Sequence, residues 1–125
     1  MLGSHLPAYL TLTEARAALG WTRRRFADGV LLGDLPVLTL TSRLRRVEAW
    51  AVSPDAPTPF PGCPSRVGLP YLSKHLQVSE KSLRQLWRTG LLPLRRRGRA
   101  LEITRPDLYD FVAQHTEGGW DGQRA

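Results

Sequence analysis

The stretch "HLQVSEKSLRQLWRTGLLPL", residues 75–94, carries the signals that decide the fold. Ser79 belongs to the residue types that cap helix N-termini, and Gly90 is the type that ends helices. Between them, Leu83 and Trp87 occupy one apolar face at helical spacing. The pattern predicts a helix that begins after Ser79 and ends before Gly90.

A second short helix is expected immediately before this one. "PYLSKHL", residues 70–76, is amphipathic, and Pro70 suits a first helical turn. Only two residues separate this segment from Ser79, so the connection is a tight turn. Helix, turn and helix together predict a helix-turn-helix, in which the second helix presents its exposed face to a DNA major groove.

The residues that follow predict a hairpin and a closing helix. "LPLRRRGRALEI", residues 92–103, alternates on both sides of Gly98, which suits a tight turn. We expect a basic hairpin, or wing, whose arginines lie along phosphates or in the adjacent minor groove. In "TRPDLYDFVAQH", Thr104 is an N-cap type and Pro106 lies near the first helical position. The apolar face of this helix holds Leu108, Phe111 and Val112.

The first half of the chain repeats these signals at a shift of 57 positions. "ALGWTRRRFADGVLLGDLPV", residues 18–37, falls on residues 75–94, with Thr22 on Ser79 and Gly33 on Gly90. Before it, "TEARAAL" predicts another short helix, which Thr13 can cap. The repeat predicts a second helix-turn-helix.

The end of the first half departs from this register. "VLTLTSRLRRVEAWAV", residues 37–52, matches the closing helix only at a shift of 64, which pairs Leu44 with Leu108 and Val47 with Phe111. About seven residues of wing are then missing. We therefore expect a closing helix and a reduced wing in the first half, with Arg43, Arg45 and Arg46 on a solvated helix face.

These segments resemble the winged helix-turn-helix of the excisionase and MerR-type DNA-binding domains. The second copy, residues 69–115, is the fuller match, because it includes Gly-x-Leu-Pro, the wing and the Arg-Pro-Asp-Leu that starts the closing helix. The first copy covers residues 9–52 and lacks much of the wing. The resemblance implies that the chain binds DNA through its second helices and its wing.

The predicted fold is mainly α with a short β-hairpin wing: two tandem winged helix-turn-helix modules joined by a Pro-rich linker. "SPDAPTPFPGCPS", residues 53–65, has five prolines and indicates an extended, semi-stiff segment. An alternative is that the halves pack together and leave only one recognition surface open. The predicted ranges are 9–52 for a helix-turn-helix module with a reduced wing, 53–67 for the linker, 68–115 for the winged module and 116–125 for a flexible tail.

Composition is consistent with a nucleic-acid partner. The net charge is +7, and 16 of the 18 basic residues are arginine, which matches phosphate geometry. A GC-rich genome produces the same bias, so composition alone does not decide the matter. The single Cys63 excludes an internal disulfide, and no apolar run reaches the roughly 18 residues of a membrane span. We expect a soluble, cytoplasmic protein.

Neither catalysis nor a cofactor is expected. His5, His75, His115 and Cys63 lack metal-ligand spacing, and no phosphate-binding loop, nucleophile motif or carboxylate pair is present in the sequence. The apolar spacing of the repeats predicts core positions for Trp21, Trp50 and Trp87, whereas Trp120 lies in the expected tail.

DNA contacts are expected from both recognition helices and from the wing. Three consecutive arginines at the start of the first recognition helix oppose its dipole, a cost that favours a functional role. In the second helix, Glu80 is favourable at the positive end of the helix dipole. The interpretation of this face as solvated and merely capped therefore has the same weight as the interpretation that it contacts DNA. The predicted DNA-binding residues are Thr22, Arg23, Arg24, Arg25, Ser79, Lys81, Ser82, Arg84, Arg88, Arg95, Arg96, Arg97 and Arg99.

The sequence indicates a sequence-specific double-stranded DNA-binding protein, either a transcriptional regulator or an excisionase-like recombination directionality factor. One monomer with two unlike recognition helices can act as a pseudo-dimer on adjacent grooves, and side-by-side assembly on DNA is a further alternative. The rival interpretation is a phage- or plasmid-type interaction module that binds a polymerase, recombinase or packaging partner. Salt dependence separates the two, because phosphate binding weakens steeply with salt.

Overall fold

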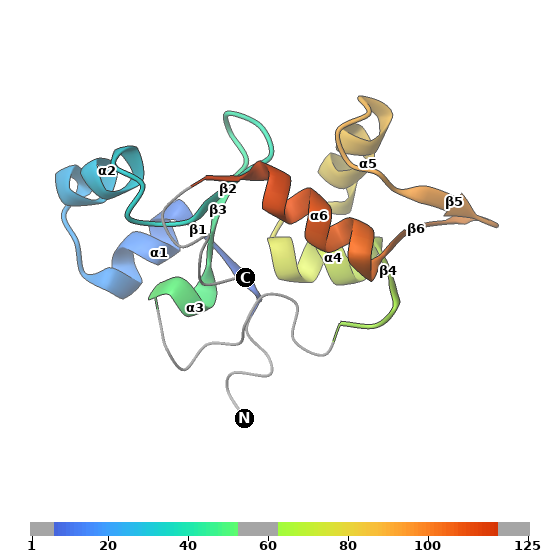
Figure 1. Ribbon diagram of the computed structural model, residues 1–125, viewed down its shortest axis with the longest axis horizontal. Helices are drawn as coiled ribbons and strands as arrows, with labels where there is room; N and C mark the ends of the chain where they lie inside the picture. Colours follow the sequence, from blue (N-terminus) through green and yellow to red (C-terminus); the bar gives the residue numbers. More distant parts are fainter. Residues whose placement is uncertain (1–6, 53–62, 118–125) are drawn as a thin grey trace.

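The chain folds into a mixed α/β structure with two antiparallel sheets. The computed structural model describes residues 7–52 and 63–117, and Figure 1 shows its helices around the two sheets. The expected mainly α fold with one small hairpin is therefore wrong. None of the described helices is long and apolar enough to cross a bilayer.

The first sheet has four strands in the order β1-β3-β2-β7, and every neighbouring pair is antiparallel. The two helices of the first helix-turn-helix lie between β1 and β2 in the chain, and a single helical turn follows β3. The elements are β1 (Tyr9–Thr11), α1 (Leu12–Leu19), α2 (Arg23–Leu31), β2 (Val37–Thr39), β3 (Arg45–Glu48), α3 (Ala49–Val52) and β7 (Thr116–Glu117).

The second sheet has three strands in the order β4-β6-β5, again antiparallel. Two helices connect β4 to the hairpin, and a longer helix follows it and returns the chain to the first sheet. The elements are β4 (Arg66–Gly68), α4 (Leu69–Leu76), α5 (Glu80–Arg88), β5 (Arg95–Arg97), β6 (Ala100–Thr104) and α6 (Arg105–His115).

The helix boundaries follow the local signals in the sequence. The hydroxyls of Thr22, Ser79 and Thr104 each accept a backbone N–H three residues ahead, which confirms all three as N-caps. Gly33 and Gly90 have φ values of +81° and +85°, so both end their helices in the left-handed region, as predicted.

The start of α1 differs from the prediction. Thr11, not Thr13, is the N-cap: its hydroxyl accepts from the Glu14 backbone N–H, and its own N–H donates to the Glu14 carboxylate. This reciprocal capping box satisfies two helix-terminal donors, which a helix starting after Thr13 would leave without these partners.

The end of the first half is a β-hairpin and not a closing helix. Val37–Thr39 pairs with Arg45–Glu48, so Leu44 and Val47 do not take the helical positions of Leu108 and Phe111. The loop is stabilised by Thr41, whose hydroxyl accepts from two backbone N–H groups after it. The prediction of a reduced wing is therefore wrong, and the closing helix shrinks to the four residues of α3.

Among the described residues, the larger of two hydrophobic clusters contains residues from both halves, while the smaller one, around Phe26 and Val47, belongs to the first half alone. Leu38 and Leu40, beside the first hairpin, lie in the same buried cluster as the α6 residues Leu108 and Phe111. In addition, β7 pairs with β2, so the predicted tail begins two residues too early. This packing contradicts two separate modules on a linker and agrees with the alternative that the halves pack together, except that both recognition helices keep exposed outer residues. Linker residues 53–62 and tail residues 118–125 lie outside the described residues.

Arg46 connects the first sheet to the turn of the second helix-turn-helix. Its guanidinium donates to the backbone carbonyls of Leu76 at 3.0 Å and Gln77 at 2.7 Å. In return, the Gln77 amide donates to the Tyr9 carbonyl at 2.9 Å and to Glu14 at 2.8 Å. The expected solvated role of Arg46 is therefore wrong, because the side chain is half-buried and fixes the position of the turn before α5.

Candidate nucleic-acid interface

Helix α5 separates an inner apolar face from an outer basic face. Leu83 and Leu86 are buried in the larger hydrophobic cluster and anchor the helix. Three basic side chains on its other side, Lys81, Arg84 and Arg88, are exposed. The hydroxyls of Ser79 and Ser82 lie 3.0 Å apart at the N-terminus, where Ser79 also caps the helix.

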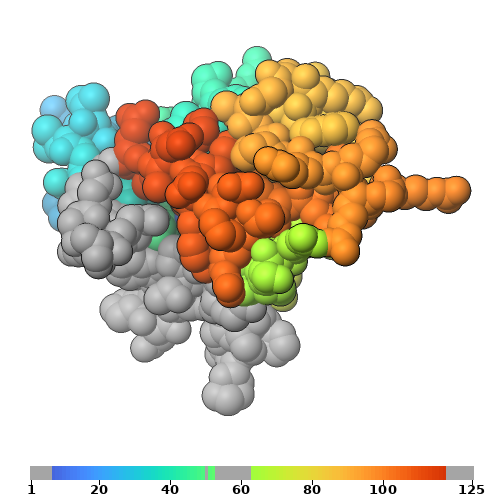
Figure 2. All heavy atoms as spheres, turned by 45° about the vertical axis from the view of Figure 1, so that its right-hand side comes forward, coloured from blue at the N-terminus to red at the C-terminus, as the bar shows by residue number. Residues whose placement is uncertain are grey.

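The β5–β6 hairpin carries the four wing arginines, as predicted. Arg97 pairs with Ala100 across a two-residue loop, and the first loop residue, Gly98, has a φ of +62°. Arg99, the second loop residue, does not have a positive φ, so the loop corresponds to a type II′ turn, which takes glycine first. All four arginines are exposed, and Figure 2 shows the hairpin projecting from the body of the molecule.

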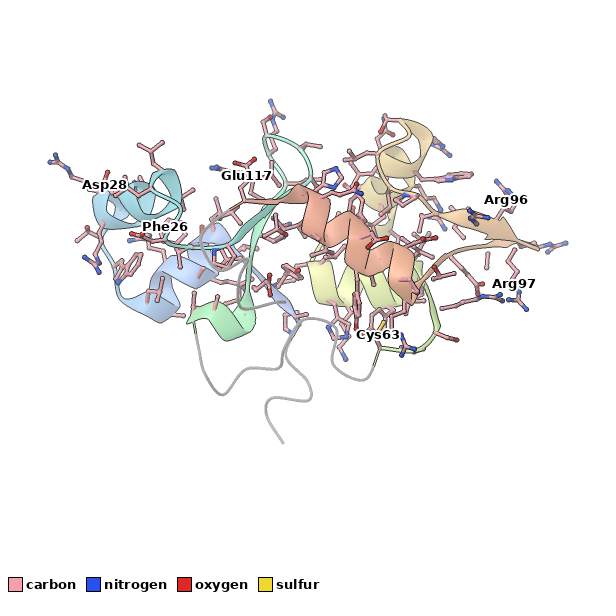
Figure 3. The ribbon with its side chains drawn as sticks, viewed as in Figure 1. Phe26, Asp28, Cys63, Arg96, Arg97 and Glu117 are labelled. Carbon is pink, nitrogen blue, oxygen red and sulfur yellow. The ribbon has the colours of Figure 1, made fainter. Side chains whose placement is uncertain are left out.

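The pleat of β5 places consecutive arginines on opposite faces of the hairpin. Arg96 lies opposite Leu101, with its guanidinium 5.4 Å from the ring centroid of Trp87 on α5. Arg97 points to the other side, as Figure 3 shows, and by the same alternation so does Arg95. The cation–π contact holds Arg96 between the hairpin and α5.

Each face of the hairpin lines a hollow that contains arginines. The hollow between α5 and the hairpin, about 290 Å³, is lined by Arg84, Arg88, Arg96, Arg99 and Trp87 among others. The second hollow, about 470 Å³, lies on β5 and β6 beside the start of α6 and includes Arg66 with Arg95 and Arg97. The structure thus brings Arg84 and Arg88 of α5 together with Arg96 and Arg99 of the wing, and it places Arg95 and Arg97 on the other face of the same hairpin.

The basic charge on the surface of α5 and the hairpin is poorly compensated. Seven basic and two acidic side chains occur from Glu80 to Glu102. Arg84 reaches Glu80 at 3.9 Å, and both side chains are about half exposed, so the pair contributes little. Within the described residues, the hairpin arginines form no ion pair. Clustered, unpaired guanidinium groups are the arrangement that binds phosphates.

Helix α2 lies at the other end of the molecule from α5 and the hairpin (Figure 1). Its predicted residues Thr22, Arg23, Arg24 and Arg25 are exposed at the helix N-terminus, and the Arg25 guanidinium stacks 4.3 Å from the Trp21 ring centroid. The structure therefore separates the predicted DNA-binding residues into two surfaces.

Trp87 and Arg66 line the surface of α5 and the hairpin but were not among the predicted site residues. The helical spacing of Trp87 predicted a core position, yet the side chain is half-buried and its exposed part faces Arg96. The sequence did contain a hint of this exposure. Trp87 takes the place of the smaller Val30 in the repeat, so its indole extends beyond the space that valine fills. Arg66 becomes part of this surface because β4 pairs with β6, and no local sequence pattern indicated that pairing.

The histidines and the cysteine have local structural partners. His75 is buried, and its Nδ1 accepts the Ala8 backbone N–H at 3.2 Å. Burial, together with the charge of Lys74, lowers the pKa of His75. Cys63 is buried, and its backbone carbonyl accepts from the Arg105 guanidinium. Across residues 7–52 and 63–117, no group of three or more His, Cys, Asp or Glu residues has metal-binding geometry.

Comparisons of the chain with protein-family models, with curated proteins and with solved structures found no match. The resemblance to excisionase and MerR-type domains therefore stays a prediction from the residues quoted above. Function has to be inferred from the basic surface of α5 and the hairpin and from the separate surface of α2.

Proposed function

We propose that this protein binds double-stranded DNA sequence-specifically in the cytoplasm, as a transcriptional regulator or an excisionase-like recombination factor. The observation that carries the proposal is the hollow between α5 and the β5–β6 hairpin, which is lined by four arginines from two elements and by two carboxylates, Glu80 and Glu102. Arg84 reaches Glu80 at 3.9 Å, and no other ion pair occurs among the described side chains of the hollow. Binding alone is proposed, with no reaction and no cofactor.

Helix α5 supplies the base-reading part of the proposed interface. Arg84 and Arg88 lie one turn apart on the exposed side, so both can enter one major groove and make forked contacts to guanine. Lys81 lies one turn nearer the N-terminus, where backbone N–H groups also favour a phosphate. DNA contact by Ser79 and Ser82 is proposed at this same end.

The hairpin supplies the phosphate-binding part. Arg95, Arg97 and Arg99 project from a narrow two-stranded element, so they can follow the backbone or enter the adjacent minor groove. Arg96 is held over Trp87 before binding, which reduces the rotamer entropy lost when it meets a phosphate. DNA contact by Thr22 and Arg23–Arg25 of α2 stays a prediction.

Selection from a random duplex library, followed by salt titration of the winners, tests this proposal. We expect an enriched motif and an affinity that falls steeply with salt. The variant Arg95→Ala/Arg96→Ala/Arg97→Ala/Arg99→Ala should reduce the slope of log affinity against log salt by up to about 3.6, since each phosphate contact contributes about 0.9. Equal salt slopes for this variant and the wild type would contradict the proposal, as would a failure to enrich any motif.

A further inference from the structure

The exposed face of α2 differs in chemistry from the matching face of α5. At the shift of 57 positions, Ala27 corresponds to Arg84, and Leu31 corresponds to Arg88. The helices are equally long, and both follow a hydroxyl cap. The second half of the outer face, which is basic on α5, is therefore apolar on α2, whereas the first turn of α2 keeps the exposed arginines Arg23–Arg25.

The end of α2 exposes two leucines that the fold does not use. The exposed fraction is 84% for Leu31 and 75% for Leu32, and the next exposed large hydrophobic residue in the described chain is Tyr109 at 44%. Phe26 and Gly29 are the buried residues of the helix, so packing does not require Leu31 or Leu32. Adjacent exposed leucines are typical of interaction surfaces.

Leu31 lines a groove between α1 and α2, whereas Leu32 lines a separate hollow beside Trp21. The groove has a volume of about 400 Å³, and its floor is apolar, with Leu12, Phe26, Ala27 and Val30. Three cations from three elements also line it: Arg16 from α1, Arg23 from α2 and Arg45 from β3. No acidic residue lines the groove, and none of these arginines forms an ion pair with a described carboxylate.

We propose that the α1–α2 groove docks an acidic, amphipathic segment of a partner protein. Apolar side chains at helical spacing would fill the groove beside Phe26 and Leu31, and carboxylates at its edge would pair with Arg16, Arg23 and Arg45. A second copy of this chain is the poorer occupant, because it would bring another net charge of +7 to a basic surface.

The position of the groove leaves the basic surface of α5 free. The two surfaces lie at opposite ends of the molecule, so one chain can hold a partner at α2 and another ligand at α5 (Figure 1). In Figure 3, Phe26 and Asp28 mark α2 at one end, and Arg96 and Arg97 mark the hairpin at the other. The docking proposal does not depend on the identity of the ligand at α5.

Selection of displayed random peptides of about 15 residues on the full-length protein tests the docking site, since helix-in-groove ligands need anchors over two or more turns. We expect enriched peptides that combine Asp or Glu with Leu or Phe at helical spacing. The variant Leu31→Ser should weaken the winning peptides about 10-fold, because an apolar contact at the groove is lost. Arg23→Gln should weaken them and reduce their salt dependence.

Tyr109→Ser is the matched control, because it removes an exposed apolar side chain from α6 and should leave peptide affinity unchanged. DNA affinity, measured in parallel, separates this proposal from the proposed function. Failure to enrich acidic amphipathic peptides would overturn the docking proposal, and so would unchanged peptide affinity in the leucine variant. Loss of DNA affinity in that variant would assign α2 to DNA, and loss of a self-association would assign the groove to a second copy.

Discussion

Helices α2 and α5 have the same backbone design and differ in the last two turns of their outer surfaces. Each begins after a hydroxyl N-cap, spans nine residues and ends before a glycine with positive φ. On the outer side, however, α5 presents Arg84 and Arg88 where α2 presents Ala27 and Leu31. The comparison teaches that capping and turn residues define the helices, whereas the exposed positions are free to specify different ligands.

On the inner faces of α2 and α5, a difference in side-chain size within the helix is compensated by a difference in the preceding turn. Trp21 and Gly29 in the first half correspond to Val78 and Leu86 in the second. A Cβ atom added to Gly29 would lie 2.9 Å from Cζ3 of Trp21, so the indole occupies the space that a larger helix residue would need. The first half therefore combines a large side chain in the turn with glycine in the helix, whereas the second half combines valine in the turn with leucine in the helix. Both combinations fill the space between turn and helix.

The largest expected effect separates the two outer faces. Arg84→Ala/Arg88→Ala should weaken DNA binding about 100-fold, because each forked or phosphate contact is worth about 1–3 kcal/mol. The matched control, Arg43→Ala/Lys74→Ala, removes two exposed cations elsewhere and should change affinity less than about 3-fold. Fluorescence anisotropy with a selected duplex measures both. Similar losses in the two variants would mean that net charge, and not the α5 face, governs binding.

The second-largest effect is expected from a substitution that removes the hydrogen bonds between the two halves. Arg46→Ala should lower the free energy of unfolding by about 2–3 kcal/mol, because two carbonyls of the α4–α5 turn lose a charged donor. Arg43→Ala, in the exposed loop of the same hairpin, should cost less than about 0.5 kcal/mol. Urea unfolding measures the difference. Equal stability of the two variants would remove Arg46 as the link between the halves.

A smaller effect tests the compensated packing of α2. Gly29→Ala should destabilise the protein by about 1–2 kcal/mol, because the new methyl group meets Trp21. In a Trp21→Val background, the same change should become neutral or stabilising by up to about 1 kcal/mol, since alanine is the better helix former. Thermal unfolding of the four proteins in this cycle gives the coupling. Additive effects would show that Trp21 and Gly29 do not share one space.

The smallest expected effect concerns pH at the contact between Ala8 and His75. Burial lowers the pKa of folded His75 below its unfolded value of about 6.5. The neutral ring therefore stabilises the fold above that pH, and this contribution is lost as pH falls through the folded pKa. Unfolding midpoints at about pH 7.5 and about pH 5 should differ less in His75→Asn than in the wild type. An unchanged difference would exclude His75 as the titrating group.

Local chemistry was sufficient to predict the elements that form the α5 surface. The Ser79 cap, the glycine at position 90 and the turn at Gly98 each act within a few residues, so helix α5 and the hairpin lie where the sequence indicates. The four wing arginines and the three basic residues of α5 were predicted as site residues for the same reason, and four of them, Arg84, Arg88, Arg96 and Arg99, line one hollow. Their contact with DNA remains a proposal.

Long-range packing was not predictable in the same way. Residues 38–41 alternate between apolar and polar side chains as a strand does, but alignment with the closing helix at the shift of 64 favoured a helix. Buried leucines such as Leu38 indicate that a core exists without indicating which segment covers them. The two residues of β7 carry no strand pattern, and only their position after α6 brings them to β2. Likewise, exposure of Leu31 depends on what the rest of the fold leaves uncovered.

The pairing of β2 with β7 has a consequence for biosynthesis. Val37 pairs with Glu117, so the first sheet stays incomplete on the ribosome until residue 117 has been synthesised. Until then β2 is an open edge, and Leu38 and Leu40 lack the cover of α6. The pairing of β7 with β2 joins residues that are far apart in the sequence, and such contacts are slow to form. Premature termination before α6 would therefore leave both halves unfinished and prone to aggregation or proteolysis.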